Sequence, residues 1–320
     1  MTPKTIQYRK VPALLVVVLL MAVAGIILIV YANDVRSAHE RIAEGSKVIH
    51  TPQGLLEYAE RGEGLPVMVL HGAGGGYDQG LLLGELLLGD GYRIIAPSRF
   101  GYLGTPIPED NSLEAQADAL VNLLDHLAVE RVAVVAASAG GPAALYFSLY
   151  HPERTASLIM ANAISYTVPP KEEDLKKLAV IHRLIGSDFI YWTILKTARK
   201  PMLNLMGVPP ETLAALGDSE QLWVNELLFS MLPMSLRLPG IKLDEGRQIP
   251  LDFPYGQITV PALVLHARDD TLVPIVQGMN TSAVIPGANS VIFETGGHFL
   301  LGETVAIRGQ ITTFLEQAKW

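Results

Sequence analysis

The chain has 320 residues, a formal net charge of −8, 49% hydrophobic residues and no cysteine. This length accommodates one large α/β domain with an insertion, or two domains. The acidic balance argues against nucleic acid as a partner, because the chain has no basic stripe to neutralise phosphates. The lack of cysteine excludes disulfides, thiolate metal sites and a cysteine nucleophile.

The N-terminal run Val11–Val30 contains no charged or strongly polar side chain. A helix of that length spans about 30 Å, the hydrocarbon thickness of a bilayer. We therefore predict a single transmembrane anchor over residues 11–32. A cytoplasmic tail is expected over residues 1–10, because Lys4, Arg9 and Lys10 precede the run, and the remainder of the chain is then expected outside the cytoplasm. Arg36, Arg41 and Lys47 follow the run closely and leave the opposite orientation open.

Two other structures would fit an apolar N-terminal run. A cleaved signal peptide could end at Val30-Tyr31-Ala32, although its apolar region usually has only ~7–15 residues. A buried core helix is the other alternative, which we disfavour because this run is apolar on every side. We favour the uncleaved anchor, followed by a charged, alanine-rich spacer, helical or flexible, over residues 33–46.

From residue 47 onward, short apolar runs alternate with amphipathic ones. Lys47–His50 and Leu55–Glu60 flank a turn with proline and glycine, which predicts an antiparallel hairpin. Strands are then expected at Pro66–Leu70, Tyr92–Pro97, Val132–Ala136, Ala156–Met160, Pro261–His266 and Ser290–Glu294. Helices are expected at Gln79–Leu88, Leu113–Leu127, Pro142–Tyr150 and Glu303–Lys319. This alternation predicts a mostly parallel sheet with helices on both faces.

The loop after the first of these strands reads His71-Gly72-Ala73-Gly74-Gly75-Gly76. So many small residues let backbone N–H groups point at a developing negative charge with no side chain in the way. A phosphate-binding loop is the alternative. The G-x-G-x-x-G spacing fails because Tyr77 stands at the third glycine, and no Gly-Lys-Ser/Thr follows.

The stretch Arg131–Gly141 combines a buried strand, Ser138, and a run of small residues that leads into a helix. Pro142 suits the first helical turn, where its missing N–H is not needed. A strand, a sharp turn carrying one serine and a helix form a nucleophile elbow, which lifts the hydroxyl above the sheet. The plainer interpretation is a polar residue in a strand-to-helix turn.

The region from 166 to 258 holds several amphipathic helical runs broken by prolines. It predicts a helical insertion within a core formed by residues 47–165 and 259–320. Some of its methionine and aromatic side chains would line a pocket, because methionine adapts to irregular ligands. These side chains are Met202, Met206, Met231, Met234, Tyr191, Trp192, Trp223 and Phe229.

Two further groups of polar residues follow the last predicted strands. Asp269 and Asp270 come after Pro261–His266, and His298 comes after two glycines that follow the final strand. One carboxylate is expected against an imidazole, and the other is expected to cap the turn or the helix at Pro274.

Together these motifs resemble the α/β-hydrolase superfamily. The pattern G-x-S-x-G reads Ala136-Ala137-Ser138-Ala139-Gly140 here, with alanine at the first glycine. The resemblance implies a nucleophile Ser138, an acid Asp270 (with Asp269 as the fallback) and a base His298, in the family's chain order. It also implies oxyanion N–H donors at Ala73, or at Gly74, and at Ala139. The insertion at 166–258 corresponds to the family's cap.

The implied chemistry is hydrolysis through an acyl-enzyme, with Ser138 deprotonated by His298 and the imidazole oriented by Asp270. We expect a small-molecule carboxylic ester, acyl or aromatic, as substrate. The same triad would serve carbon–carbon bond hydrolysis, and a non-catalytic ligand-binding protein of the same fold is the alternative of another class. Neither a metal nor an organic cofactor is implied, because no histidine or carboxylate cluster has ligand spacing.

Overall fold

The computed structural model describes residues 13–167, 181–247, 249–250, 252–318 and 320. The cytoplasmic tail expected over residues 1–10 lies outside these described residues, as do the first two residues of the expected anchor. Residues 168–180 of the expected insertion lie outside them as well.

The described residues form an eight-stranded sheet with the order β1-β2-β4-β3-β5-β6-β7-β8. The strands are β1 Lys47–Thr51, β2 Gly54–Arg61, β3 Leu65–Leu70, β4 Tyr92–Pro97, β5 Val132–Ala137, β6 Thr155–Ala161, β7 Ala262–Ala267 and β8 Asn289–Phe293. The β1–β2 and β2–β4 pairs are antiparallel, and the remaining pairs are parallel. The sheet therefore confirms the predicted hairpin and the mostly parallel order.

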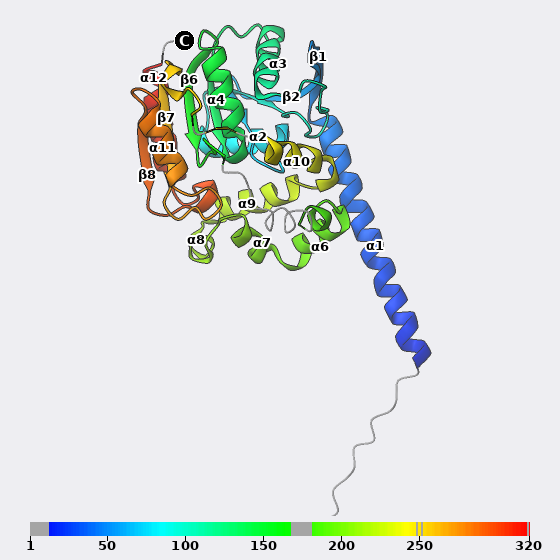
Figure 1. Cartoon of the computed structure of the whole chain (residues 1–320). Coiled ribbons are helices and arrows are strands. Elements are labelled where there is room, and N and C mark those ends of the chain that lie inside the picture. Colours follow the sequence, from blue (N-terminus) through cyan, green and yellow to red (C-terminus); the bar gives the residue numbers. More distant parts are fainter. Residues whose placement is uncertain (1–12, 168–180, 248, 251, 319) are drawn as a thin grey trace, which may run out of the picture.

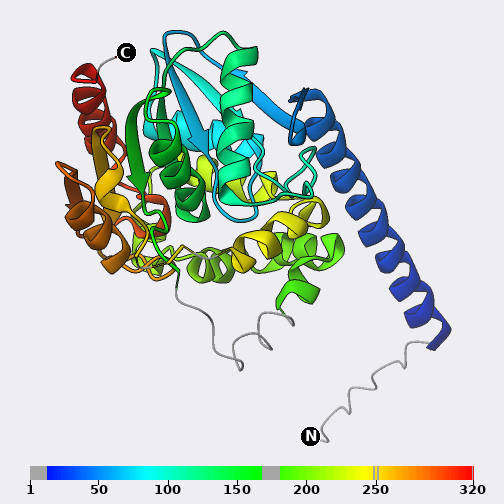
Figure 2. The ribbon, with the colours of Figure 1, turned by 45° about the horizontal axis from the view of Figure 1, so that its top comes forward.

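Helices cover both faces of the sheet (Figure 2). They are α2 Tyr77–Leu87, α3 Leu113–His126, α4 Gly141–Tyr150, α11 Val276–Val284 and α12 Thr304–Glu316. Strand β3 shows how the faces divide: Val67 and Val69 join a core cluster with α2 and α12, whereas Met68 and Leu70 join a cluster with α3 and α4. Successive side chains of a strand point to opposite faces, so a central strand must be apolar throughout.

The connection from β6 to β7 contains the helices α6 Asp188–Thr197, α7 Arg199–Leu205, α8 Pro210–Ala215, α9 Asp218–Ser230 and α10 Leu238–Gly246. We call α6–α10 the cap helices. They lie together on one side of the sheet (Figure 1). Their interior is apolar, and Tyr191, Leu227 and Leu228 are fully buried. Met206, at the end of α7, lines a cavity together with Ser138, so the cap helices cover the carboxyl edge of the sheet.

Helix α1, Ala13–Glu44, is one uninterrupted helix of 32 residues. None of its most apolar 18-residue window is buried, so that part is not a core helix of this domain, and it is long and apolar enough to cross a membrane. Its N-terminal half projects away from the domain (Figure 1). The segment expected as a spacer continues the same helix to Glu44, and Ala38 and Ile42 within it are buried.

The middle of α1 is bonded to cap helix α6. The ring of Tyr31 packs edge-on against Phe189 and Trp192, with centroid distances of 5.1 and 5.5 Å. About one helical turn further along α1, Oδ2 of Asp34 accepts the indole N–H of Trp192 at 2.7 Å and lies 2.9 Å from Nζ of Lys196. The helix therefore leaves the domain directly from an aromatic cluster at the end of its apolar run.

The start of α4 passes very close to the segment after β6. A β-carbon built on Gly141 would lie 2.0 Å from the carbonyl oxygen of Ile164, and one on Gly140 would lie 2.4 Å from the carbonyl oxygen of Leu70. Both contacts are with backbone, which has little freedom to move aside. These two glycines allow the elbow to sit against its neighbouring strands.

We predict that Gly141→Ala lowers the free energy of unfolding by about 1–3 kcal/mol, because the added methyl overpacks this contact. Gly309→Ala, in the exposed interior of α12 with no atom within 4 Å of the new β-carbon, is the matched control and should stabilise by about 0.4–1 kcal/mol. Thermal unfolding of both variants in detergent measures the difference, and equal stabilisation by the two substitutions would contradict the prediction.

Candidate active site

Ser138 lies in the turn between β5 and α4, at the carboxyl edge of the sheet. Its φ is +51°, a left-handed conformation that is strained for a residue with a side chain. Both backbone groups of Ser138 bond to the segment after β6: its N–H donates to the carbonyl of Asn162 at 3.2 Å, and its carbonyl accepts the N–H of Ile164 at 2.9 Å. This local geometry is that of a nucleophile elbow.

Asp270 follows β7, and His298 lies in the short helical turn after β8. Nδ1 of His298 is 2.8 Å from Oδ2 of Asp270, and both side chains are buried. The other oxygen of Asp270 accepts the N–H groups of Leu272 and Val273 at 2.8 and 2.9 Å. An imidazole that donates from Nδ1 keeps Nε2 as its acceptor, which is the tautomer required of a base for a serine.

Asp269 occupies a different position from its neighbour. Its Oδ1 accepts the N–H of Gly297, at 2.9 Å, in the bend before His298. The turn near Pro274, which the sequence analysis assigned to the second acid, is instead capped by Asp270 itself. Asp270 is therefore the acid that meets the imidazole, and Asp269 fixes the loop that carries it.

Asn162, directly after β6, holds the histidine loop and was not identified from the sequence. Its Nδ2 donates to the carbonyls of Gly297 and His298, at 2.8 and 3.0 Å, and its Oδ1 accepts the N–H of Ala267 at 2.8 Å. Its φ is +45°, in a region that asparagine tolerates better than most residues. An asparagine at the end of a buried strand was the available signal.

The glycine-rich loop after β3 runs directly against Ser138. A β-carbon on Gly72 would lie 3.0 Å from Cβ of Ser138. The loop is pinned by the N–H of Gly72, which donates to Oε1 of Gln79 at 3.0 Å. Ala73 lines the same two cavities as Ser138, and Ala139 lines the larger of them. The residues expected to supply oxyanion donors thus surround the serine.

His71, at the base of this loop, is fully buried and neutral. Its Nε2 accepts the N–H of Arg99 at 3.1 Å, and its Nδ1 lies 2.7 Å from the carbonyl of Gly72, so the proton is on Nδ1. Burial, and then the charge of Arg99, hold the pKa of His71 well below its usual value. His71 thus shapes the loop and is not a base.

Arg99 ties the loop to the cap helices. Its Nε donates to the carbonyl of His71 at 3.0 Å, and its two terminal nitrogens bind Asp244 of α10 at 2.6 and 2.8 Å. The hydroxyl of Tyr102 donates to the same carboxylate at 2.6 Å. A bidentate ion pair of this kind fixes geometry as well as charge.

Two cavities meet at Ser138. The smaller, about 70 Å³, has an apolar lining that includes Leu83, Leu87, Met206, Phe299 and Leu300. The larger, about 410 Å³, has several polar side chains in its lining, among them Tyr166, Asp244, Glu245, Arg247 and Gln277. His298 lines the smaller cavity together with Ser138. In the described part of the chain, no group of three or more histidine or acidic side chains could hold a metal ion.

Of the cap methionines expected near a pocket, Met206 lines the smaller cavity. Met231 and Met234 approach the glycine-rich loop instead: a β-carbon on Gly74 would lie 2.5 and 4.0 Å from their respective methyl carbons. The cap therefore contacts both the serine cavity and the glycine-rich loop.

Comparison with known proteins agrees with this geometry. A family model for the alpha/beta hydrolase fold matches residues 66–304. The chain belongs to the α/β-hydrolase family.

Two curated relatives and two solved structures are similar to the chain. It is 28% identical to the uncharacterized hydrolase YcgS of Bacillus subtilis, over 82% of this chain and 95% of the relative. It is also 28% identical to a 2-hydroxy-6-oxononadienedioate/2-hydroxy-6-oxononatrienedioate hydrolase of Paraburkholderia xenovorans, over 81% of this chain and 88% of the relative. An α/β-hydrolase fold protein from Nakamurella multipartita superposes with a TM-score of 0.70 at 22% identity, covering 85% of this chain and 99% of that one. A membrane phospholipase A, described as a bacterial virulence factor, gives a TM-score of 0.63 at 20% identity, covering 95% and 97%.

The buried, neutral state of His71 predicts a pH dependence of stability. Its folded pKa lies below the ordinary value of about 6.5, so the unfolded chain binds the extra proton first. Stability is therefore complete above that ordinary value and is lost as the pH falls below it, by up to about 1.4 kcal/mol per pH unit from this group. Chemical unfolding at several pH values from 5 to 8 measures the free energy of unfolding. The slope of this free energy against pH should be shallower for His71→Gln than for the wild type. Identical slopes would show that His71 is not held neutral.

Proposed function

We propose that the protein is a membrane-anchored serine hydrolase that cleaves a carboxylic ester through an acyl-enzyme. The observation that carries this proposal is the short contact between His298 and Asp270, with His298 and Ser138 on the wall of one cavity. Hydrolase activity itself is the property of the family to which the chain belongs.

In the proposed reaction, Nε2 of His298 accepts the proton of the Ser138 hydroxyl as the oxygen attacks the ester carbonyl. The N–H groups of Ala73 and Ala139 stabilise the oxyanion, each by about 3 kcal/mol. The imidazolium then protonates the departing alkoxide, which leaves as the alcohol. Water, deprotonated by the same imidazole, attacks the acyl-enzyme, and the serine leaves with that proton.

The two cavities at Ser138 support an ester with two unlike parts. The smaller cavity suits a short apolar group, because aliphatic and aromatic side chains line it. The larger one offers hydrogen-bonding partners such as Arg247 and Gln277, and so suits a bulkier part with polar atoms. An acyl or aromatic ester satisfies both.

Carbon–carbon bond hydrolysis is the second candidate, favoured by the similarity to the hydrolase of 2-hydroxy-6-oxo dienedioates. The same serine, histidine and aspartate would serve it. Steady-state kinetics on a chain-length series of nitrophenyl esters and on 2-hydroxy-6-oxo-dienoates separate the two. A kcat/KM for the dienoates at least tenfold above that for every ester would replace the proposed reaction by the second candidate.

The membrane anchor is proposed from the course of α1. The site at which a signal peptide could be cut, Val30-Tyr31-Ala32, lies inside this helix, and Tyr31 packs on the cap. Cleavage after Ala32 would cut the helix between Tyr31 and Asp34, which both contact cap helix α6. The basic residues Lys4, Arg9 and Lys10 favour a cytoplasmic N-terminus and an extracytoplasmic catalytic domain.

Ser138→Ala should abolish covalent labelling by a fluorophosphonate probe. Asp270→Asn should lower kcat by ~10⁴-fold, because an amide that donates to Nδ1 of His298 favours the tautomer with its proton on Nε2, which cannot accept the serine proton. Ser148→Ala is the matched control, since its hydroxyl is buried in α4 and has no hydrogen-bond partner among the described residues. It should leave labelling unchanged. A folded wild-type protein that the probe does not label would favour the ligand-binding alternative.

The anchor predicts that the full-length protein stays in the membrane pellet after alkaline carbonate and is released by detergent. N-terminal sequencing of the purified protein should find residues that precede Val11. A mature chain that begins at or after Ala32 would instead identify the segment as a cleaved signal peptide.

A further inference from the structure

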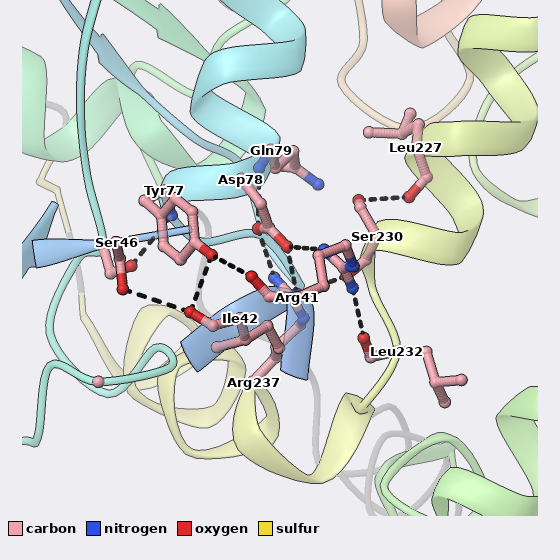
Figure 3. A network of polar contacts seen from close by, with 12 residues as sticks. Arg41, Ile42, Ser46, Tyr77, Asp78, Gln79, Leu227, Ser230, Leu232 and Arg237 are labelled. Carbon is pink, nitrogen blue, oxygen red and sulfur yellow. Dashed lines mark hydrogen bonds and ion pairs between the residues drawn. The ribbon is translucent and has the colours of Figure 1, made fainter. Parts of the chain in front are cut away.

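A second cluster of charged side chains lies away from the serine and joins three parts of the chain (Figure 3). Asp78, the second residue of α2, accepts from Arg41 of α1 and from Arg237 of the segment before α10. The distances to Oδ2 are 2.7 and 2.8 Å, and a second nitrogen of Arg237 lies 3.1 Å from Oδ1. Arg237 is fully buried, whereas the Arg41 side chain is 40% exposed.

Arg41 also reaches the cap. Its second terminal nitrogen donates to the carbonyls of Ser230 and Leu232, at 3.0 and 2.8 Å, where α9 ends. One residue further along α1, the carbonyl of Ile42 accepts the hydroxyl of Tyr77 at 3.0 Å. The last turns of the anchor helix thus hold both the start of α2 and the end of α9.

The start of α2 in turn fixes the oxyanion loop. The backbone N–H of Gln79 donates to Oδ1 of Asp78 at 2.9 Å. The side-chain Oε1 of Gln79 accepts the N–H of Gly72 at 3.0 Å. The fit is tight, because a β-carbon on Gly75 would lie 2.4 Å from that same Oε1. Consecutive residues of α2 therefore bind the anchor helix on one side and the oxyanion loop on the other.

The other side of the loop rests on the cap segment that Arg41 holds. Met231 lies between Ser230 and Leu232 in sequence, and its methyl carbon packs directly on Gly74. The oxyanion loop is thus enclosed between α2 and residues 230–232, and one guanidinium is bonded to both.

We propose that Arg41 is a positioning residue of the active site, and that the anchor helix sets the geometry of the oxyanion loop through Asp78, Gln79 and Met231. Burial alone would favour the neutral form of Asp78, but the charges of Arg237 and Arg41 lower its pKa below the usual value, so the carboxylate remains available to both. The effect of Arg41 on the reaction rate rests on the proposed serine hydrolase reaction. The effect of Arg41 on the geometry of the loop does not depend on that reaction.

The alternative is that Arg41 only contributes to the stability of the fold. A purely stabilising contact would change the unfolding temperature and leave the rate of the folded enzyme unaltered. Loss of positioning would lower kcat and the acylation rate with little change in KM, because the oxyanion donors act in the transition state.

The test uses full-length Arg41→Gln in detergent, assayed at a temperature at which it is fully folded. We expect a roughly 10- to 100-fold fall in kcat and in the rate of fluorophosphonate labelling of Ser138, with KM within about twofold. Arg41→Lys should recover part of this loss, since an ammonium can pair with Asp78 but cannot bind Ser230 and Leu232 as well. Arg36→Gln, on the same helix with an exposed pair to Glu40, is the matched control and should be unaffected.

Amide hydrogen exchange gives a readout that does not depend on hydrolysis. Peptides covering residues 71–80 should exchange at least about tenfold faster in Arg41→Gln than in the wild type. Peptides from β5 should be unchanged. A wild type without activity but with this exchange difference would refute the proposed reaction and leave the positioning role intact.

Unchanged exchange in residues 71–80, or a folded Arg41→Gln enzyme with wild-type kcat, overturns the proposal. If Arg41→Gln does not fold, Tyr77→Phe replaces it, because this variant loses only the hydroxyl that binds the Ile42 carbonyl. It should show the same direction of change at a smaller magnitude, and wild-type exchange and kcat in Tyr77→Phe would then count against the proposal.

Discussion

One carboxylate determines where the candidate base points. Asp270 uses one oxygen to accept two backbone N–H groups of its own turn and the other to accept Nδ1 of His298. The backbone contacts leave that carboxylate with a single orientation, and the imidazole takes its tautomer from it. Because Asp270 follows β7 and His298 follows β8, the parallel pairing of these two strands brings the two groups to one edge. The sheet is therefore the part of the fold on which the chemistry depends.

The strands of the sheet could be predicted from the sequence because the central ones are buried on both faces and are therefore continuously apolar. Tyr92–Pro97 was predicted at its observed bounds, and the other strands agree to within a residue or so at each end. Continuous apolar runs bounded by glycine and proline carry that information locally. The attachment of α1 could not be found in the same way. Arg41 and Asp78 are 37 residues apart, and Asp78 and Arg237 are 159 apart, so each looks like an ordinary surface charge until the fold brings them together.

The residues of the candidate site likewise fall into those that local sequence predicts and those that depend on contacts between distant segments. Ser138, Asp270 and His298 were chosen because each follows a predicted strand in the order typical of the family, and parallel strands present such residues at a common edge. Asn162 also follows a strand, but its three hydrogen bonds go to segments more than a hundred residues away, and nothing local predicts them. The sequence indicated that Asp269 would bind a nearby turn or the imidazole, but it did not identify the N–H of Gly297 as its partner, since both neighbouring acids could cap a turn.

Among the described residues, hydrogen bonds join the cap helices to the rest of the domain at several points, three of which bear on the candidate site. Arg99 binds Asp244 of α10, the N–H of His298 donates to the carbonyl of Gly207 at 2.8 Å, and Arg41 binds the end of α9. Each of these residues also touches a group that shapes the candidate site: the glycine-rich loop after β3, the turn that carries His298, or the start of α2. A displacement of the cap would have to break these hydrogen bonds, among them the buried, charge-assisted pair of Arg99 and Asp244, and it is costly to leave such polar groups unpaired. The cap helices, the glycine-rich loop after β3 and the end of α1 consequently form one mechanical unit, in which the long N-terminal helix is a structural part of the domain.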